Sequence, residues 1–214
     1  MSASDFTLYG YFRSSAAFRV RIALNLKGIA AQQRFVHLRK NDQFGTDYDL
    51  LNPQHLVPAL VHGDTVITQS IAIMEYLDEV VPSSRLLPAD ARGRAQVRAL
   101  SLAVACDIHP LNNLRVLRHL ESMEIDEDAR TQWQRHWAME GFAALEQELS
   151  NRTGRFCYGD TPTMADCCLI PQLTNARRVD CDLSVYPSLL AIEQACYALP
   201  AFADARPENQ PDAE

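Results

Sequence analysis

Three short segments in the first 70 residues carry the side chains that could do chemistry. The first is Arg13-Ser14-Ser15, which lies where an alternating apolar pattern gives way to a helical one. The main-chain N–H groups and the dipole at a helix N-terminus favour an anion, including a thiolate, and the two hydroxyls add donors. From these residues alone, however, the favoured interpretation is a plain N-terminal cap formed by Ser14 or Ser15.

The other two segments lie further along the same half of the chain. Val57-Pro58 opens a short apolar run, and its peptide bond is expected to be trans by default. A cis bond would instead turn the N–H and C=O of Val57 outward to pair with an extended peptide ligand. Gln69-Ser70 begins a helical pattern, where Gln69 can bond a carboxylate or an amine and Ser70 can bind an anion. An N-terminal cap is again the default interpretation.

The elements that would position these segments follow from apolar periodicity. Strands are predicted at 6–11, 33–38, 58–61 and 65–68, and helices at 18–26, 43–51 and 70–77. Gly63-Asp64 predicts a hairpin between the last two strands, and Lys27-Gly28 ends the first helix. The order β-α-β-α-β-β-α indicates a small mixed sheet, in which the first two strands are parallel.

Strand patterns vanish after the proline-bounded segment 82–88. Helices are predicted at 92–121, 126–150, 163–177 and 186–198, and the polar tail at 206–212 is expected to be loose. Thr163 and Asp166 have the spacing of a capping box, which indicates a structural carboxylate. The prediction is an α/β domain at 1–83, a linker at 84–91, and an all-helical domain at 92–214.

Composition excludes several function classes. The chain has 214 residues and a net charge of −7, which argues against sequence-independent binding of nucleic acid. No apolar run approaches the ~20 residues of a membrane span, and Met1–Asp5 show no secretory signal, so a cytoplasmic protein is expected. Six cysteines without a C-x-x-C pair indicate reduced, buried thiols and no metal site. Arginine outnumbers lysine 18 to 2. Two explanations are open: codon bias, or the use of some arginines to bind carboxylates.

Together these segments resemble the zeta class of glutathione transferases, which includes maleylacetoacetate and maleylpyruvate isomerases. The resemblance spans roughly residues 6–212, and the motifs that carry it are, in chain order, Tyr9-Gly10-Tyr11-Phe12-Arg13-Ser14-Ser15, Arg19-Val20-Arg21-Ile22-Ala23-Leu24, Leu51-Asn52-Pro53, Gln69-Ser70-Ile71-Ala72-Ile73, Arg85-Leu86-Leu87-Pro88 and Gly159-Asp160-Thr161-Pro162-Thr163-Met164-Ala165-Asp166. It implies a thioredoxin-like domain that binds glutathione, followed by a C-terminal helical bundle, and a homodimer.

The resemblance also implies residue roles. Ser14 would donate a hydrogen bond to the glutathione sulfur, with Ser15 as the reserve candidate. Glutathione would be bound by Gln43, Val57, a cis Pro58, Gln69, Ser70, His109, Asn113 and Arg115. The carboxylates of a diacid substrate would be bound by Arg13, Arg115 and Arg178, because a guanidinium matches a carboxylate bidentately.

One residue departs from the zeta pattern. Ala16 stands where the family has a cysteine, so any role of that thiol is lost. The maleylpyruvate branch shares this feature, and His109 also favours that branch. The implied reaction is cis–trans isomerisation of a maleyl-type keto diacid by reversible addition of the glutathione thiolate to the double bond. The alternatives are a transferase or dehalogenase that consumes glutathione, and a non-catalytic module that only binds it.

Overall fold

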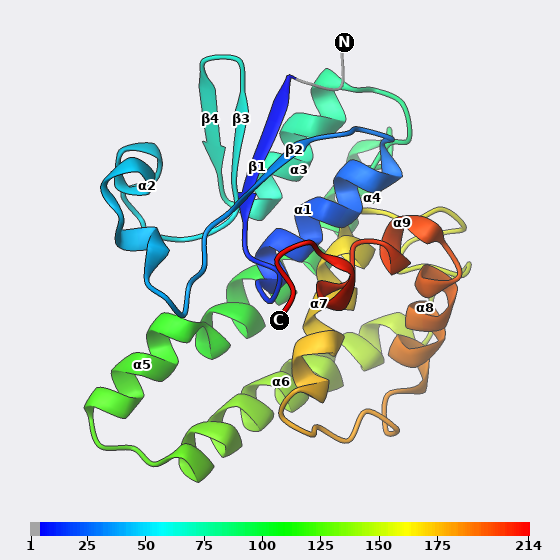
Figure 1. Cartoon of the computed structure of the whole chain (residues 1–214). Helices are drawn as coiled ribbons and strands as arrows, with labels where there is room; N and C mark the ends of the chain where they lie inside the picture. Colours follow the sequence, from blue (N-terminus) through cyan, green and yellow to red (C-terminus); the bar gives the residue numbers. More distant parts are fainter. Residues whose placement is uncertain (1–4) are drawn as a thin grey trace. The chain divides into compact units, whose positions relative to one another are not determined.

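The computed structural model describes residues 5–214 (Figure 1). Contacts within the chain divide it into two compact units. One unit contains the chain up to Leu87 together with Tyr197–Glu214, and the other is Pro88–Cys196. The predicted boundary placed everything after residue 92 with the helices, so the structure departs from it at the C-terminal end. Of the segment Met1–Asp5, in which no secretory signal was found, residues 1–4 lie outside the described residues.

The first unit is built on a four-stranded sheet in the order β2-β1-β3-β4. Its strands are β1 (Phe6–Gly10), β2 (Gln32–Phe35), β3 (Ala59–His62) and β4 (Thr65–Thr68). β1 pairs in parallel with β2 and antiparallel with β3, while β3 and β4 form a hairpin. The predicted mixed sheet and hairpin are therefore confirmed.

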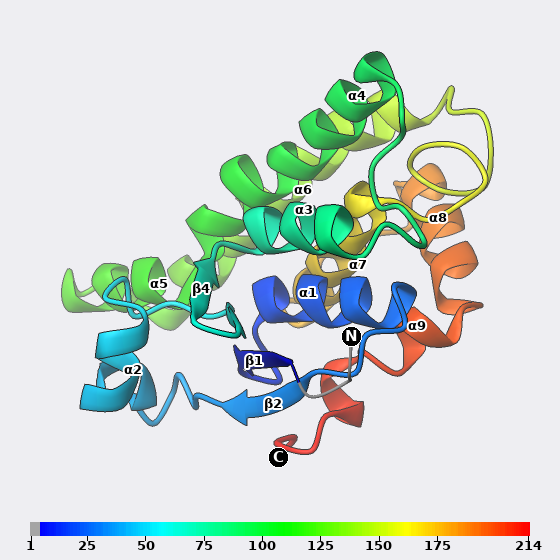
Figure 2. The ribbon, with the colours of Figure 1, turned by 90° about the horizontal axis from the view of Figure 1, so that it is seen from above.

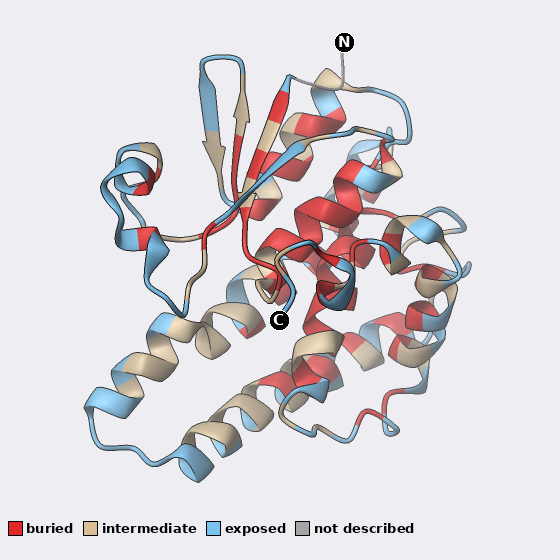
Figure 3. Ribbon diagram, in the orientation of Figure 1, coloured by how far each residue is buried: buried red, intermediate tan, exposed pale blue. Residues whose placement is uncertain are grey.

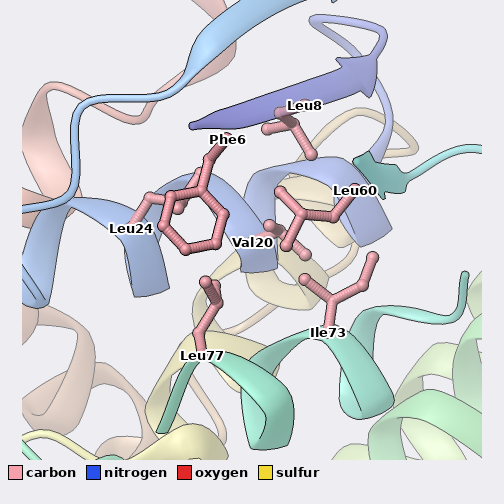
Figure 4. Packing of buried hydrophobic residues seen from close by; sticks show 7 residues of the cluster. All are labelled: Phe6, Leu8, Val20, Leu24, Leu60, Ile73 and Leu77. Atoms are coloured by element: carbon pink, nitrogen blue, oxygen red, sulfur yellow. The ribbon is translucent and has the colours of Figure 1, made fainter. Parts of the chain in front are cut away.

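Helices α1 (Ser15–Leu26) and α3 (Ser70–Val80) cover one face of this sheet (Figure 2). Apolar side chains from both helices and from two strands meet between them (Figure 4): Phe6, Leu8, Val20, Leu24, Leu60, Ile73 and Leu77. They recur every second residue on β1 and every fourth on each helix, as the two backbone geometries require. Burying each contributes about 1.5–3 kcal/mol, so this core holds both helices against the sheet.

The remaining part of the first unit contains shorter elements. The predicted helix at 43–51 is a 3₁₀ turn, Asp42–Phe44, followed by α2 (Thr46–Leu51). Near the C-terminus, α9 (Pro200–Ala203) and a 3₁₀ turn, Pro207–Asn209, precede the last residues. The prediction of a loose tail is wrong, because the Gln210 amide donates to the carbonyls of Asp204 and Arg206 and is itself buried.

The second unit consists of helices: α4 (Ala91–Leu102), α5 (Leu114–Ser122), α6 (Glu127–Leu149), α7 (Met164–Arg177) and α8 (Pro187–Tyr197). Eleven residues of α7 are buried, more than in any other helix of this unit, and much of the ribbon around it is coloured as buried in Figure 3. The described residues contain no helix long and apolar enough to span a membrane.

The predicted single helix at 92–121 is interrupted. A π turn, Ala103–Ile108, and a 3₁₀ turn, His109–Asn112, separate α4 from α5. Pro110 lies in the second turn, and because proline lacks an N–H it cannot continue the α-helical ladder. Gly141 of α6 allows the π turn to pack closely, since a Cβ there would lie 2.3 Å from the Ile108 side chain.

Candidate functional site

The strand register brings the three candidate segments of the first unit to one edge of the sheet. Tyr9 of β1 pairs with Ala59 of β3, and Ala59 pairs with Thr68 of β4. Because both pairings are antiparallel, the chain leaves β1, enters β3 and leaves β4 at the same edge. The segments around Ser14, Pro58 and Ser70 therefore lie along that edge.

Ser14 is the N-cap of α1. Its Oγ accepts a hydrogen bond from the Ala17 N–H at 3.2 Å, and its own N–H donates to the Tyr11 carbonyl at 2.9 Å. A hydroxyl that accepts in this way still has its proton to donate. The half-buried Ser14 can therefore cap the helix and stabilise an anion at the same time, so the two interpretations of this segment do not exclude each other.

The neighbours of Ser14 differ in accessibility. Ser15 is the first residue of α1 and only 4% exposed, whereas Arg13 and Ala16 are half-buried. Ala16 fills the place of the family cysteine with a methyl group, which can neither accept nor donate a hydrogen bond. Of the two serines, Ser14 is thus the more accessible to a bound thiol.

Val57-Pro58 is a cis peptide bond, as the resemblance implied. The preceding Leu56 carbonyl accepts hydrogen bonds from the Tyr48 hydroxyl at 2.6 Å and from the Asn52 amide at 2.7 Å. Burial raises the pKa of Tyr48 to about 12, so its hydroxyl keeps its proton at neutral pH. The main-chain groups of Val57 have no hydrogen-bond partner among residues 5–214, and they can pair with an extended peptide.

The start of α3 differs from the expected serine cap. Gln69 is the N-cap, with a φ of 71°, and Ser70 is the first helical residue. The buried Ser70 Oγ accepts a hydrogen bond from the Arg19 Nη1 atom at 3.2 Å, which ties α3 to α1. The exposed Gln69 donates through Nε2 to the Gln54 side chain at 3.0 Å.

Arg19 was missed by sequence reasoning as a part of this site. It is 2% exposed and brings a positive charge to the hydroxyl of Ser70, one of the candidate residues. The signal in the sequence was its position between Phe18 and Val20, in the apolar part of a helix. A charged residue there is rarely buried without a specific partner.

Gln43 lies in the 3₁₀ turn Asp42–Phe44 and is 4% exposed. Its Oε1 atom is buried and has no hydrogen-bond partner in the part of the chain that the structure describes. A buried acceptor without a partner costs about 1–3 kcal/mol. A ligand N–H that reached Oε1 would recover this free energy.

The other four predicted site residues belong to the second unit. Asn113 caps α5, and its Oδ1 accepts from the Arg115 N–H at 3.1 Å. His109, four residues earlier, is half-buried in the 3₁₀ turn, while the Arg115 side chain is exposed. Arg178 lies on a different element, at the C-cap of α7, where its Nη1 donates to Asn175 at 3.0 Å.

The capping-box carboxylate of α7 is structural, as predicted. Asp166 is fully buried and accepts hydrogen bonds from the N–H of Cys157 at 2.8 Å and from the N–H and hydroxyl of Thr163 at 2.7 and 2.9 Å. On α6, the rings of Trp133 and Trp137 are in edge-to-face contact, with their centroids 5.6 Å apart.

All six cysteines are free thiols. Four of them are buried, Cys181 is half-buried and Cys106 is exposed, so the expectation of buried thiols fails for Cys106. Residues 5–214 contain no cluster of histidine, cysteine and carboxylate side chains that could bind a metal ion.

A mixed sheet with a cis-proline at a strand start, joined to a helical unit, defines a thioredoxin-like protein of the glutathione transferase fold. The N-terminal domain model of glutathione S-transferases matches residues 4–79, and the C-terminal domain model matches residues 127–199. A probable maleylacetoacetate isomerase from Vibrio cholerae is 48% identical over 96% of this chain and 97% of its own. The chain therefore belongs to the glutathione S-transferase family.

Solved structures agree with this assignment. The holo structure of a maleyl pyruvate isomerase, a bacterial glutathione S-transferase of the zeta class, is 47% identical with a TM-score of 0.95, over 97% of this chain and all of the other. Maleylacetoacetate isomerase from Anaeromyxobacter dehalogenans is 43% identical with a TM-score of 0.88, over 98% and 97% of the two chains. It was solved with dicarboxyethyl glutathione and citrate in the active site.

Proposed function

We propose that this protein is a glutathione-dependent cis–trans isomerase. Its substrate is a maleyl-type keto diacid, maleylpyruvate or maleylacetoacetate, and its product is the fumaryl isomer. The observation that carries the proposal is the meeting of the Ser14 helix N-terminus, cis-Pro58 and Ser70 at one sheet edge, in a chain 48% identical to a probable maleylacetoacetate isomerase. Glutathione is the cofactor.

The residues of the first unit fit glutathione, a tripeptide with two carboxylates and a thiol. The main chain of Val57 pairs with the cysteinyl part, and the buried Gln43 Oε1 accepts from a ligand N–H. Gln69 and Ser70 bind the γ-glutamyl end at the N-terminus of α3, with the Arg19 guanidinium beneath. We assign further glutathione contacts to His109, Asn113 and Arg115 of the second unit, on the resemblance to the family.

The chemistry needs a nucleophile, an anion site and two carboxylate anchors. Glutathione supplies the thiolate, which adds to the double bond, permits rotation and leaves again. Ser14 donates its hydroxyl proton to the sulfur, and the N-terminus of α1 favours the negative charge. Ser15 is the alternative donor. Arg13, Arg115 and Arg178 anchor the substrate carboxylates, and anchoring both ends orients the double bond.

The anchoring role of Arg13 gives a testable prediction. Arg13→Met should raise the KM for the diacid about tenfold to a hundredfold, because a charge-assisted hydrogen bond contributes about 1.5–3 kcal/mol. The KM for a neutral aromatic electrophile should change less than twofold. Arg34→Met is a matched control, since it removes the same charge from an exposed position on β2. An equal rise for both substrates would show that Arg13 is not a carboxylate anchor.

Mass balance separates the proposed function from its alternatives. Purified protein is incubated with maleylpyruvate or maleylacetoacetate, with and without glutathione, and both the diacid and the free thiol are measured. The isomerase converts many equivalents of diacid per glutathione and leaves the thiol concentration constant. Stoichiometric loss of thiol in a parallel assay with an aromatic or halogenated electrophile, while both diacids stay untouched, would establish a consuming transferase or dehalogenase. Binding of glutathione without turnover of any electrophile would establish a non-catalytic module.

We further propose a cytoplasmic homodimer. Six free thiols suit a reducing compartment. Dimerisation is supported by the resemblance to the family and by large apolar side chains that the single chain leaves exposed, among them Phe44, Leu50 and Val66. Light scattering coupled to size-exclusion chromatography tests the assembly.

A further inference from the structure

The C-terminal segment holds the turn that carries the thiol-activating serine. The Phe12 N–H donates to the Asp212 Oδ2 atom at 2.9 Å, across 200 residues of sequence. The carbonyl of the same residue accepts from the Arg21 Nη2 atom at 3.2 Å. Both main-chain groups of Phe12, two residues before Ser14, are thus bound by side chains that the mechanism does not use.

Arg21 connects this turn to the C-terminal segment. It is 5% exposed on α1, and besides Phe12 it contacts the Tyr11 carbonyl at 3.5 Å through Nη1. Its Nε atom donates to the Ala205 carbonyl at 3.1 Å. One guanidinium therefore joins the end of β1, the start of the turn and the segment that leads to Asp212.

The C-terminal segment is itself anchored at several points in the first unit. The Asn25 amide donates to the Ala201 carbonyl at 3.0 Å, and Gln210 is buried against its own segment. At the end of the chain, the Glu214 carboxylate binds His37 at 3.0 Å and Lys40 at 3.1 Å. Anchors on both sides of Asp212 fix the place of its carboxylate.

Charge alone gives no reason for an aspartate in this position. A negative charge beside the turn opposes the formation of a glutathione thiolate next to the Ser14 hydroxyl, because like charges repel. What the carboxylate offers is an acceptor for the Phe12 N–H, which complements the Ser14 N–H bond to the Tyr11 carbonyl. The contribution of Asp212 is therefore to hold the main chain of the turn in place.

We propose that Asp212, with Arg21, is a positioning residue for the thiol-activating turn. The pair holds Phe12 by both main-chain groups, so that the Ser14 hydroxyl and the first N–H groups of α1 stay directed at the sulfur. The inference rests on the proposed function for the identity of the thiol, which is that of glutathione.

The test is an ultraviolet titration of the thiolate in the glutathione complex, with kcat and KM measured in parallel. Asp212→Ala should reduce the thiolate fraction at neutral pH about threefold to tenfold, as expected for the loss of one hydrogen bond. Its kcat should fall in proportion, with the KM for glutathione changed less than twofold. Asp212→Asn keeps an acceptor oxygen, so it should keep the wild-type thiolate fraction or exceed it. Glu208→Ala, which removes a nearby exposed carboxylate, should change nothing.

Two outcomes would overturn the proposal. An equal rise of the thiolate fraction in Asp212→Ala and Asp212→Asn would show a purely electrostatic effect, and wild-type titration in both would show no effect at all.

If Asp212→Ala does not fold, a chain ending at Pro211 should show the same loss of thiolate fraction, since the anchor at Gln210 remains. If the wild type binds glutathione but does not isomerise the diacid, the proposed function is wrong. The titration still tests whether Asp212 positions the turn. A wild type that does not bind glutathione overturns both.

Discussion

Ser14→Ala should lower the kcat of isomerisation about tenfold to a hundredfold. The hydroxyl that donates to the thiolate is then missing, and a hydrogen bond to a charged group contributes about 1.5–3 kcal/mol. The pKa of the bound thiol rises accordingly, so the profile of kcat against pH should shift to higher pH. Steady-state kinetics between pH 6 and 9, with the thiolate absorbance of the glutathione complex, measure both effects.

The capping role of Ser14 requires matched variants. Alanine at an N-cap costs about 1 kcal/mol of stability, whereas glycine costs only a few tenths. Ser14→Gly should therefore be as slow as Ser14→Ala but nearly as stable as the wild type, and Ser14→Thr, which keeps the hydroxyl, should keep most of the activity. Ser15→Ala changes a buried residue and should leave the pKa of the bound thiol unchanged. If Ser15→Ala alone shifted the titration, the activating role would belong to Ser15.

Asp166→Ala should destabilise the protein by about 3–5 kcal/mol. The substitution removes the acceptor of three hydrogen bonds and leaves the N–H of Cys157 and the two donors of Thr163 buried without a partner, each at a cost of about 1–3 kcal/mol. Urea unfolding followed by circular dichroism measures the change. Asp160→Ala is the control, because among residues 5–214 that exposed carboxylate accepts a single hydrogen bond, from the Arg155 N–H. Equal losses for the two variants would contradict a special role of Asp166.

The same carboxyl should produce a pH dependence. Burial raises the pKa of Asp166 above the usual value of 3.8, against the opposing effect of its Cys157 and Thr163 donors. The folded state then binds this proton more tightly than the unfolded chain, so the stability from Asp166 is complete below about pH 3.8 and is lost as the pH rises through the folded-state pKa. Asp166→Asn does not titrate, and the difference in unfolding free energy between it and the wild type should shrink with rising pH.

Local patterns in the sequence were sufficient for the strands, for most of the helices and for the fold class. These patterns are short-range: the alternation around Leu8, the four-residue spacing of Val20 and Leu24, and the turn signal Gly63-Asp64. The structure confirms the strand, the helix and the hairpin that they predict. The resemblance to the zeta class added the cis bond at Pro58, which the residues alone did not favour.

Two local predictions failed because an interaction elsewhere in the chain decided the outcome. Ser70 was expected to cap α3, yet its hydroxyl binds Arg19 on another helix, and Gln69 is the cap. The tail was expected to be loose on account of its polar composition, yet Asp212 binds the Phe12 N–H. These two bonds join residues 51 and 200 positions apart, so no window of neighbouring residues could reveal them.

The sequence by itself determined the order of the strands and of most helices, the family, and the residue types proposed to activate a thiol and to bind carboxylates. Only the tertiary structure decided that Ser14, Pro58 and Ser70 share one edge of the sheet, because that depends on the register of β1, β3 and β4. It also decided that the C-terminus belongs to the first unit, through the buried guanidinium of Arg21 and the carboxylate of Asp212. Register and long-range hydrogen bonds depend on which surfaces pack together, and a linear pattern of residue types does not specify that.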